Sequence, residues 1–205
     1  MKDRKPSRKP SSGFHRRDFL KGSSAAAAAT ALATAPAYAE EATAVSRLLG
    51  PGMTTITLSV NGKDRKVEVE PRMTLLEALR YGLDLTGAKP VSSEGSSGAS
   101  TVLVDDKPIS ASTTLALDCI GKQIRTIESL DDNDPIIQAF VHQDGMQCGF
   151  CTPGFVVAVR AFLDKHPNAT EEDIRAGLNG NICCCGTYAD LIQAVLEAVK
   201  GGSRG

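Results

Sequence analysis

Alternating apolar and polar residues begin near position 56 and predict a pair of β-strands. Residues 56–60 read Ile-Thr-Leu-Ser-Val, which is the period-2 pattern of a half-buried strand. Asn61-Gly62 follows directly and is a strong signal for a tight hairpin turn. Residues 67–69 read Val-Glu-Val, so we expect the chain to return as a second strand.

The pattern then predicts a short helix, a long loop and another strand. Thr74 and Glu77 have the spacing of a capping box, and the helix is expected to run to about Tyr81. Residues 87–99 are rich in Gly and Ser, and residues 101–104 form a short apolar strand. This order predicts a ferredoxin-like domain of β-grasp shape at residues 53–130.

The second half has helical periodicity, with four start signals. Asp134-Pro135 and Thr152-Pro153 each place proline at the first helical position. Thr170 precedes three acidic residues, and a last helix begins near Ala189. We expect a four-helix bundle at residues 131–200 and a disordered tail at 201–205. The fold class is therefore α+β.

The first 39 residues have the organisation of a twin-arginine signal peptide. Arg16-Arg17 precede an alanine-rich run from Ala25 to Ala35, and Ala37-Tyr38-Ala39 is a small-x-small cleavage site. The apolar run has about half of the roughly 20 residues that span a bilayer. An uncleaved amphipathic anchor is the alternative. We predict export to the periplasm, a linker at residues 40–52 and no membrane span.

Charge excludes one class of partner. Residues 1–39 carry 8 basic and 2 acidic residues, so the rest carries 15 basic and 22 acidic residues, a net charge of −7. Nucleic-acid binding needs a basic footprint, which this balance argues against. The three His residues are scattered, and His142 and His166 are interpreted as helix-surface or helix-end residues.

Five of the six cysteines lie just before two predicted helices. Cys148 and Cys151 form a C-x-x-C pair, and Cys183-Cys184-Cys185 are consecutive. An exported protein would usually form disulfides, but adjacent cysteines rarely satisfy disulfide geometry together. Two cysteine pairs suit either an iron–sulfur cluster or tetrahedral zinc, and spacing alone favours neither. Inert buried thiols are the third interpretation. Cys119 lies outside both groups, and we expect it to be a buried small hydrophobe on an apolar strand.

The residues around these cysteines give a more specific signal than the cysteine spacing alone. Residues 147–154 read Gln-Cys-Gly-Phe-Cys-Thr-Pro-Gly, and residues 180–188 read Gly-Asn-Ile-Cys-Cys-Cys-Gly-Thr-Tyr. Together they resemble the small iron–sulfur subunit of the xanthine oxidase family of molybdenum hydroxylases, over roughly residues 53–199. The resemblance implies that a [2Fe–2S] cluster is ligated by Cys148, Cys151, Cys183 and Cys185. It also implies that Gln147 hydrogen-bonds toward the pterin of a molybdenum cofactor held by a partner subunit.

The chain departs from this family at five positions. Arg is common in the family where this chain has Cys184, which we expect to be a spare thiol pointing away from the cluster; ligand exchange with Cys183 or Cys185 is the alternative. The family's N-terminal cluster uses C-x4-C-x2-C and a fourth Cys. The corresponding residues here are Ser92, Ser97, Ser100 and Ser112. Aliphatic hydroxyls ionise far less readily than thiols, so we predict that this site holds no cluster.

These observations predict an electron-transfer subunit with one [2Fe–2S] cluster. Its expected partners are a large molybdenum-binding subunit, which carries catalysis, and a flavin or cytochrome subunit. A structural or assembly subunit with little electron flux is the alternative that the four serines favour. A zinc-stabilised interaction module would follow only if the resemblance were misleading.

Overall fold

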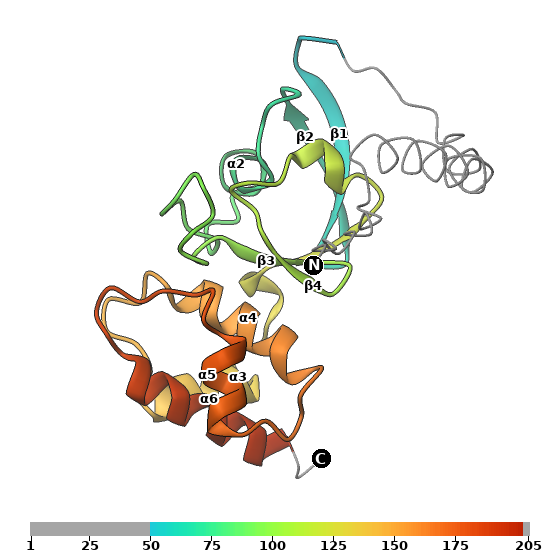
Figure 1. Cartoon of the computed structure of the whole chain (residues 1–205). Helices are drawn as coiled ribbons and strands as arrows, with labels where there is room; N and C mark the ends of the chain where they lie inside the picture. The colour runs from blue at the N-terminus through green and yellow to red at the C-terminus, as the bar shows by residue number, and fades with distance from the viewer. Residues whose placement is uncertain (1–49, 203–205) are drawn as a thin grey trace, which may run out of the picture. The chain divides into compact units, whose positions relative to one another are not determined.

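The computed structural model describes residues 50–202 (Figure 1). The predicted signal peptide and most of the predicted linker lie outside the described residues. The described residues belong to one compact unit, and the last helix continues to Gly202, two residues into the predicted tail. No helix in residues 50–202 is long and apolar enough to cross a membrane.

The first half of the described chain forms a five-stranded mixed sheet. Its strands are β1 (Thr54–Val60), β2 (Lys63–Val69), β3 (Thr101–Val104), β4 (Lys107–Ser110) and β5 (Gln123–Arg125). Their order is β2-β1-β5-β3-β4, and β1 pairs in parallel with β5 while the other pairs are antiparallel. The predicted hairpin is confirmed. Its turn residues Asn61 and Gly62 both have positive φ, at 53° and 73°, as a type I′ turn requires.

The capping box starts the helix that covers this sheet. The Glu77 N–H donates to Thr74 Oγ1 at 3.2 Å, and the Thr74 N–H donates to Glu77 Oε2 at 2.8 Å. The helix is regular only in α2 (Leu75–Glu77) and widens to a π-helix over Ala78–Gly82. Leu75, Leu76 and Leu79 are buried in the same core as the inward side chains of β1, β2, β3 and β5.

Four helices make up the second half. They are α3 (Pro135–His142), α4 (Thr152–Leu163), α5 (Glu171–Gly177) and α6 (Tyr188–Gly202). Asp134 caps α3 and Thr170 caps α5, as the sequence predicted. The sequence predicted Thr152 as the cap of α4, but Cys151 is the N-cap and Thr152 is the first helical residue, so the prediction was one residue late. The helices share a separate core centred on Phe140, Phe155 and Val159.

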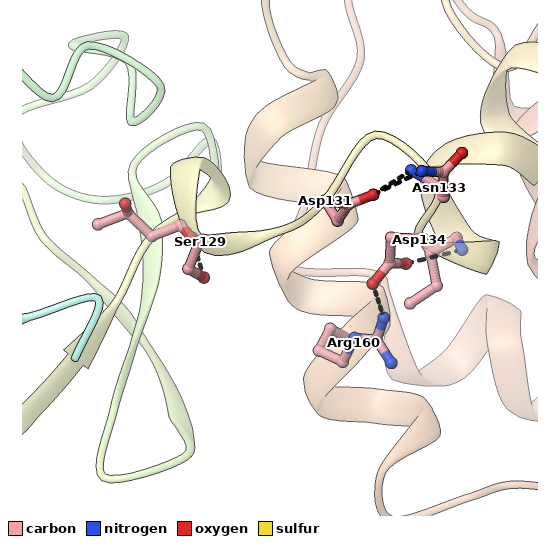
Figure 2. Close-up of polar contacts among 7 residues, drawn as sticks. Ser129, Asp131, Asn133, Asp134 and Arg160 are labelled. Carbon is pink, nitrogen blue, oxygen red and sulfur yellow. Dashed lines mark hydrogen bonds and ion pairs between the residues drawn. The ribbon is translucent and has the colours of Figure 1, made fainter.

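The segment between the two halves is held by polar contacts (Figure 2). The Ser129 hydroxyl donates to the Thr126 carbonyl at 2.7 Å, and Asp131 accepts from the Asn133 backbone and side chain at 2.8 and 2.9 Å. Asp134 accepts the Ile136 N–H at 2.9 Å and forms an ion pair with Arg160 of α4. The same carboxylate therefore starts α3 and ties it to α4.

Helix α4 packs directly against the sheet half. A small apolar cluster of Leu103, Val157 and Ala161 joins β3 to α4. Gly154 lies so close to the loop before β3 that a Cβ on it would be 2.3 Å from the Gly98 carbonyl oxygen. The Ile182 N–H donates to the Ser97 carbonyl at 2.9 Å, which connects this loop to the cysteine loop before α6. Two separate cores thus meet along one well-packed contact.

Candidate metal centre

Four cysteines converge at the starts of two helices. Cys148 and Cys151 lie in the loop before α4, and Cys183 and Cys185 lie in the loop before α6. Cys183 is buried, Cys151 and Cys185 are half-buried, and Cys148 is exposed. The partial positive charge at a helix N-terminus stabilises a nearby thiolate. This effect favours the thiolate form near both helix starts, whereas burial opposes it at Cys151 and Cys183.

The thiols interact as two pairs. Cys151 interacts with Cys183, and Cys148 interacts with Cys185. In each pair the pKa of one thiol is lowered and that of the other is raised, as expected when two thiols share a proton. We call Cys151 and Cys183 the inner pair, and Cys148 and Cys185 the outer pair.

The inner pair lies in the more structured environment. Burial opposes the thiolate of Cys183, but hydrogen bonds from the Thr187 hydroxyl and backbone outweigh it and lower the pKa of Cys183 to about 6. Burial, with the neighbouring Cys183 thiol, raises the pKa of Cys151 to about 12. In the outer pair, the Phe150 backbone N–H is the main cause of the lowered pKa of Cys148.

Sequence reasoning assigned no role to Thr187 or Tyr188, although both stand in the quoted motif. Thr187 Oγ1 lies 3.3 Å from Cys183 Sγ, and the Cys183 N–H donates to the Tyr188 hydroxyl at 2.8 Å. The Tyr188 ring packs edge-on against Phe155 of α4. These contacts fix the orientation of Cys183, which spacing alone did not reveal.

The surroundings fit a two-iron cluster better than a single ion. A [2Fe–2S] cluster takes two thiolates on each iron, which matches the two pairs. Gly149 and Gly186 have positive φ, and nothing lies within 4 Å of where their Cβ atoms would be. The loops therefore leave space beside the thiols.

The neighbours of the outer pair face solvent. Gln147 and Cys184 are exposed, and the Phe150 ring is 49% exposed with Lys89 Nζ 5.8 Å from its centroid. Cys184 is exposed, as a spare thiol that points away from the two pairs would be. Beside this loop lies an apolar pocket of about 240 Å³ lined by Phe140, Met146 and Pro153.

The four serines form no comparable group. Ser100 and Ser112 are joined by a 3.1 Å hydrogen bond, and Ser110 closes a triad with them at 3.2 and 3.0 Å. Ser92 pairs instead with Ser96 at 3.0 Å, and Ser97 accepts the Ala99 N–H at 3.3 Å. Sequence reasoning missed Ser110, although its spacing from Ser112 places both on one side of an extended chain. The hydroxyls of Ser100, Ser110 and Ser112 thus satisfy one another's hydrogen bonding.

The remaining cysteine and histidines lie away from the two thiol pairs. Cys119 is buried, as predicted, but it lies in a 3₁₀ turn (Ala116–Cys119) instead of the apolar strand expected for it. Burial raises the pKa of its thiol. His142 is an exposed partner of Glu197 at 3.0 Å, and His166 stacks on Phe162. Their predicted placement at helix surfaces and ends is confirmed.

Comparisons with known proteins agree with this geometry. The family model described as "[2Fe-2S] binding domain" matches residues 126–196, and the twin-arginine signal model matches residues 13–33, which implies export to the periplasm. The chain is 38% identical to the aldehyde oxidoreductase iron-sulfur-binding subunit PaoA of Escherichia coli O157:H7, over 89% of this chain and 87% of that one.

Two further relatives extend the similarity. The nicotine 6-hydroxylase small subunit of Paenarthrobacter nicotinovorans is 39% identical over 70% of this chain and 88% of that one. The structure of quinoline 2-oxidoreductase from Pseudomonas putida 86 superposes with a TM-score of 0.71 at 34% identity, covering 75% of this chain and 98% of that chain. The chain therefore belongs to the small [2Fe–2S] subunits of the xanthine oxidase family of molybdenum hydroxylases, which are parts of multi-subunit oxidoreductases.

Proposed function

We propose that this subunit transfers electrons through a single [2Fe–2S] cluster bound by Cys148, Cys151, Cys183 and Cys185. The observation that carries the proposal is the grouping of these thiols into an inner and an outer pair at two helix starts. When bound, such a cluster accepts and releases one electron at a time. The chain's own residues set its environment, and hydrogen bonds and solvent exposure are the properties that tune cluster potentials.

The two pairs would give the two irons different surroundings. Cys183 of the inner pair is held by Thr187 and follows Ile182, whose N–H donates to the Ser97 carbonyl of the sheet half. The outer pair lies beside exposed Gln147 and Phe150. We therefore assign the outer pair to the side that meets the molybdenum-binding subunit, with the Gln147 amide directed to the pterin of its cofactor.

The serine positions would leave the sheet half without a cluster. Ligation requires a deprotonated donor, and a serine hydroxyl is both harder to ionise and a harder donor than iron–sulfide clusters prefer. Ser100, Ser110 and Ser112 also bond to one another, so any metal would have to break that triad. Electrons would then leave from the helical half to an acceptor such as a flavin or cytochrome subunit.

The partner would supply the substrate chemistry. Relatives named for aldehyde and nicotine oxidation suggest an aldehyde or N-heterocycle as the substrate class. The domain boundary near residue 130 belongs to the same proposal, and the separate cores on either side support it.

Metal analysis of the purified full-length chain tests the proposal. We expect about two irons and two acid-labile sulfides per chain, with one EPR signal after reduction. About four irons would contradict the one-cluster assignment, and zinc without sulfide would contradict electron transfer. A Gln147→Ala variant should keep its iron while electron transfer from molybdenum slows.

A structural or assembly role is the second candidate, and the four serines at the N-terminal positions favour it. The two roles differ in a complex that contains the molybdenum-binding chain. Reduction of the iron–sulfur signal by substrate within turnover time supports electron transfer. A cluster that stays oxidised while the complex turns over supports the scaffold.

A further inference from the structure

We propose that the Thr187 hydroxyl donates a hydrogen bond to the sulfur of iron-bound Cys183 and thereby raises the reduction potential of the [2Fe–2S] cluster. The inference rests on the proposed function and adds to it a residue that acts through one of the ligands. Thr187 Oγ1 lies 3.3 Å from Cys183 Sγ, and the two residues are only 3% and 7% exposed. Water therefore has little access to this contact.

Iron binding decides the direction of this hydrogen bond. In the metal-free protein, either the Cys183 thiol or the Thr187 hydroxyl can be the donor. A cysteine that binds iron does so as a thiolate, which has no proton to donate. The hydroxyl is then the donor and the charged sulfur is the acceptor. Hydrogen bonds to a charged partner are stronger than those between neutral groups.

The surrounding structure holds both partners in place. The Cys183 N–H donates to the Tyr188 hydroxyl at 2.8 Å, and the Tyr188 ring packs edge-on against Phe155 of α4. The Thr187 carbonyl accepts the Leu191 N–H at 2.9 Å, which fixes Thr187 to the first turn of α6. These contacts are made by the protein alone, so the hydroxyl is positioned before any iron is bound.

The effect on the reduction potential follows from charge. Reduction adds one negative charge to the irons, sulfides and thiolates, so a donor directed at a thiolate sulfur stabilises the reduced form more than the oxidised form. Hydrogen bonds to the sulfurs and solvent exposure both set cluster potentials. Cys148 of the outer pair is exposed to water, whereas Cys183 is buried. The Thr187 hydroxyl thus supplies on the buried side the stabilisation that water supplies on the exposed side.

Thr187→Val in the full-length chain, purified with its iron, tests this inference. The substitution removes the hydroxyl and nearly preserves the shape of the side chain. Redox titration followed by EPR should show that the equilibrium constant for one-electron reduction falls about tenfold, which is a potential lower by about 59 mV. Iron and sulfide should stay at about two each per chain. A change of less than about twofold in that constant, with iron retained, overturns the inference.

Two further variants separate the hydroxyl from the packing of the side chain. Thr187→Ser keeps the hydroxyl, and its reduction constant should stay within about twofold of the wild-type value. A serine variant that falls as far as Thr187→Val would point to the methyl group and contradict the inference. Thr152→Val is the matched control, because Thr152 follows Cys151 directly and is half-buried, yet its hydroxyl makes none of the hydrogen bonds found in residues 50–202. An equal fall in both valine variants would also refute the role of Thr187.

Resonance Raman spectroscopy reports on the hydrogen bond itself. In D₂O the iron–thiolate stretching bands of the wild type should shift, because the hydroxyl proton exchanges, and the shift should be smaller in Thr187→Val. Equal shifts in the two proteins would count against the bond.

Loss of iron has a defined meaning in each protein. If Thr187→Val is recovered without iron, Thr187→Ala removes the same hydroxyl with less bulk and its potential is measured instead. Iron loss from both variants would make the hydroxyl a requirement for cluster binding and overturn its tuning role. A wild type without iron and sulfide would end the proposed function itself, whereas an iron-loaded Thr187→Val with the wild-type potential ends only this inference.

Discussion

Gly154→Ala should destabilise the protein, although alanine favours helices. Gly154 is in the first turn of α4, where replacing glycine by alanine would ordinarily stabilise by up to about 1 kcal/mol. Here the added Cβ would lie 2.3 Å from the Gly98 carbonyl oxygen and 3.0 Å from Ala99 Cα. Both neighbours are backbone atoms, so the helix and the loop before β3 must separate.

The magnitude follows from these two opposing terms. Forcing an extra methyl into a packed contact costs about 1–3 kcal/mol, and a clash this severe belongs at the upper end. Subtracting the helix term leaves about 2 kcal/mol of destabilisation, or a fall in Tm of about 4–8 °C for a chain of this size. The Ile182–Ser97 hydrogen bond beside this contact should also open more often.

Calorimetry and hydrogen exchange measure both effects. The control is Gly201→Ala in α6, where nothing lies within 4 Å of the added Cβ, and its Tm should stay level or rise. Ile182 amide exchange should accelerate in Gly154→Ala and remain unchanged in the control. If Gly154→Ala melts at or above the wild-type Tm with Ile182 still protected, our account of the contact between the two halves is wrong.

Two other predictions concern the cysteine site of the helical half and the serine positions of the sheet half. In the metal-free, reduced protein, the pKa of Cys183 is about 6 against an ordinary value of 9.0, so the folded state loses a proton that the unfolded state keeps. The free energy of unfolding, measured by urea titration, should therefore rise from pH 6 to pH 9, and this gain should vanish as the pH falls through 6. The Thr187→Val variant should show a smaller rise. An unchanged pH dependence in that variant would contradict the role of the Thr187 hydroxyl. Changing Ser92, Ser97, Ser100 and Ser112 together to Cys should raise iron from about two to about four per chain and add a second EPR signal. Backbone N–H groups of Ser96, Ala99 and Ser112 already point at three of the four hydroxyls, at 3.1–3.3 Å, so unchanged iron in a folded variant would show that the loop is not preorganised.

Short-range signals in the sequence determined the hairpin turn, the helix starts and the candidate ligands of this protein. The Asn61-Gly62 turn, the Thr74–Glu77 capping box and the Asp134-Pro135 helix start each depend on residues within four positions. Such features form wherever the chain places them, because their hydrogen bonds are local. The cysteine motif is likewise a local string, which is why the candidate ligands could be named before the fold was known.

Only the tertiary structure decided how those residues meet. The pairing of Cys151 with Cys183 and of Cys148 with Cys185 joins two helix starts more than thirty positions apart in sequence. The Ser100–Ser110–Ser112 triad and the contact of Gly154 with Gly98 likewise need β3, β4 and α4 to be packed first. These contacts depend on the packing of distant segments, which no local pattern encodes.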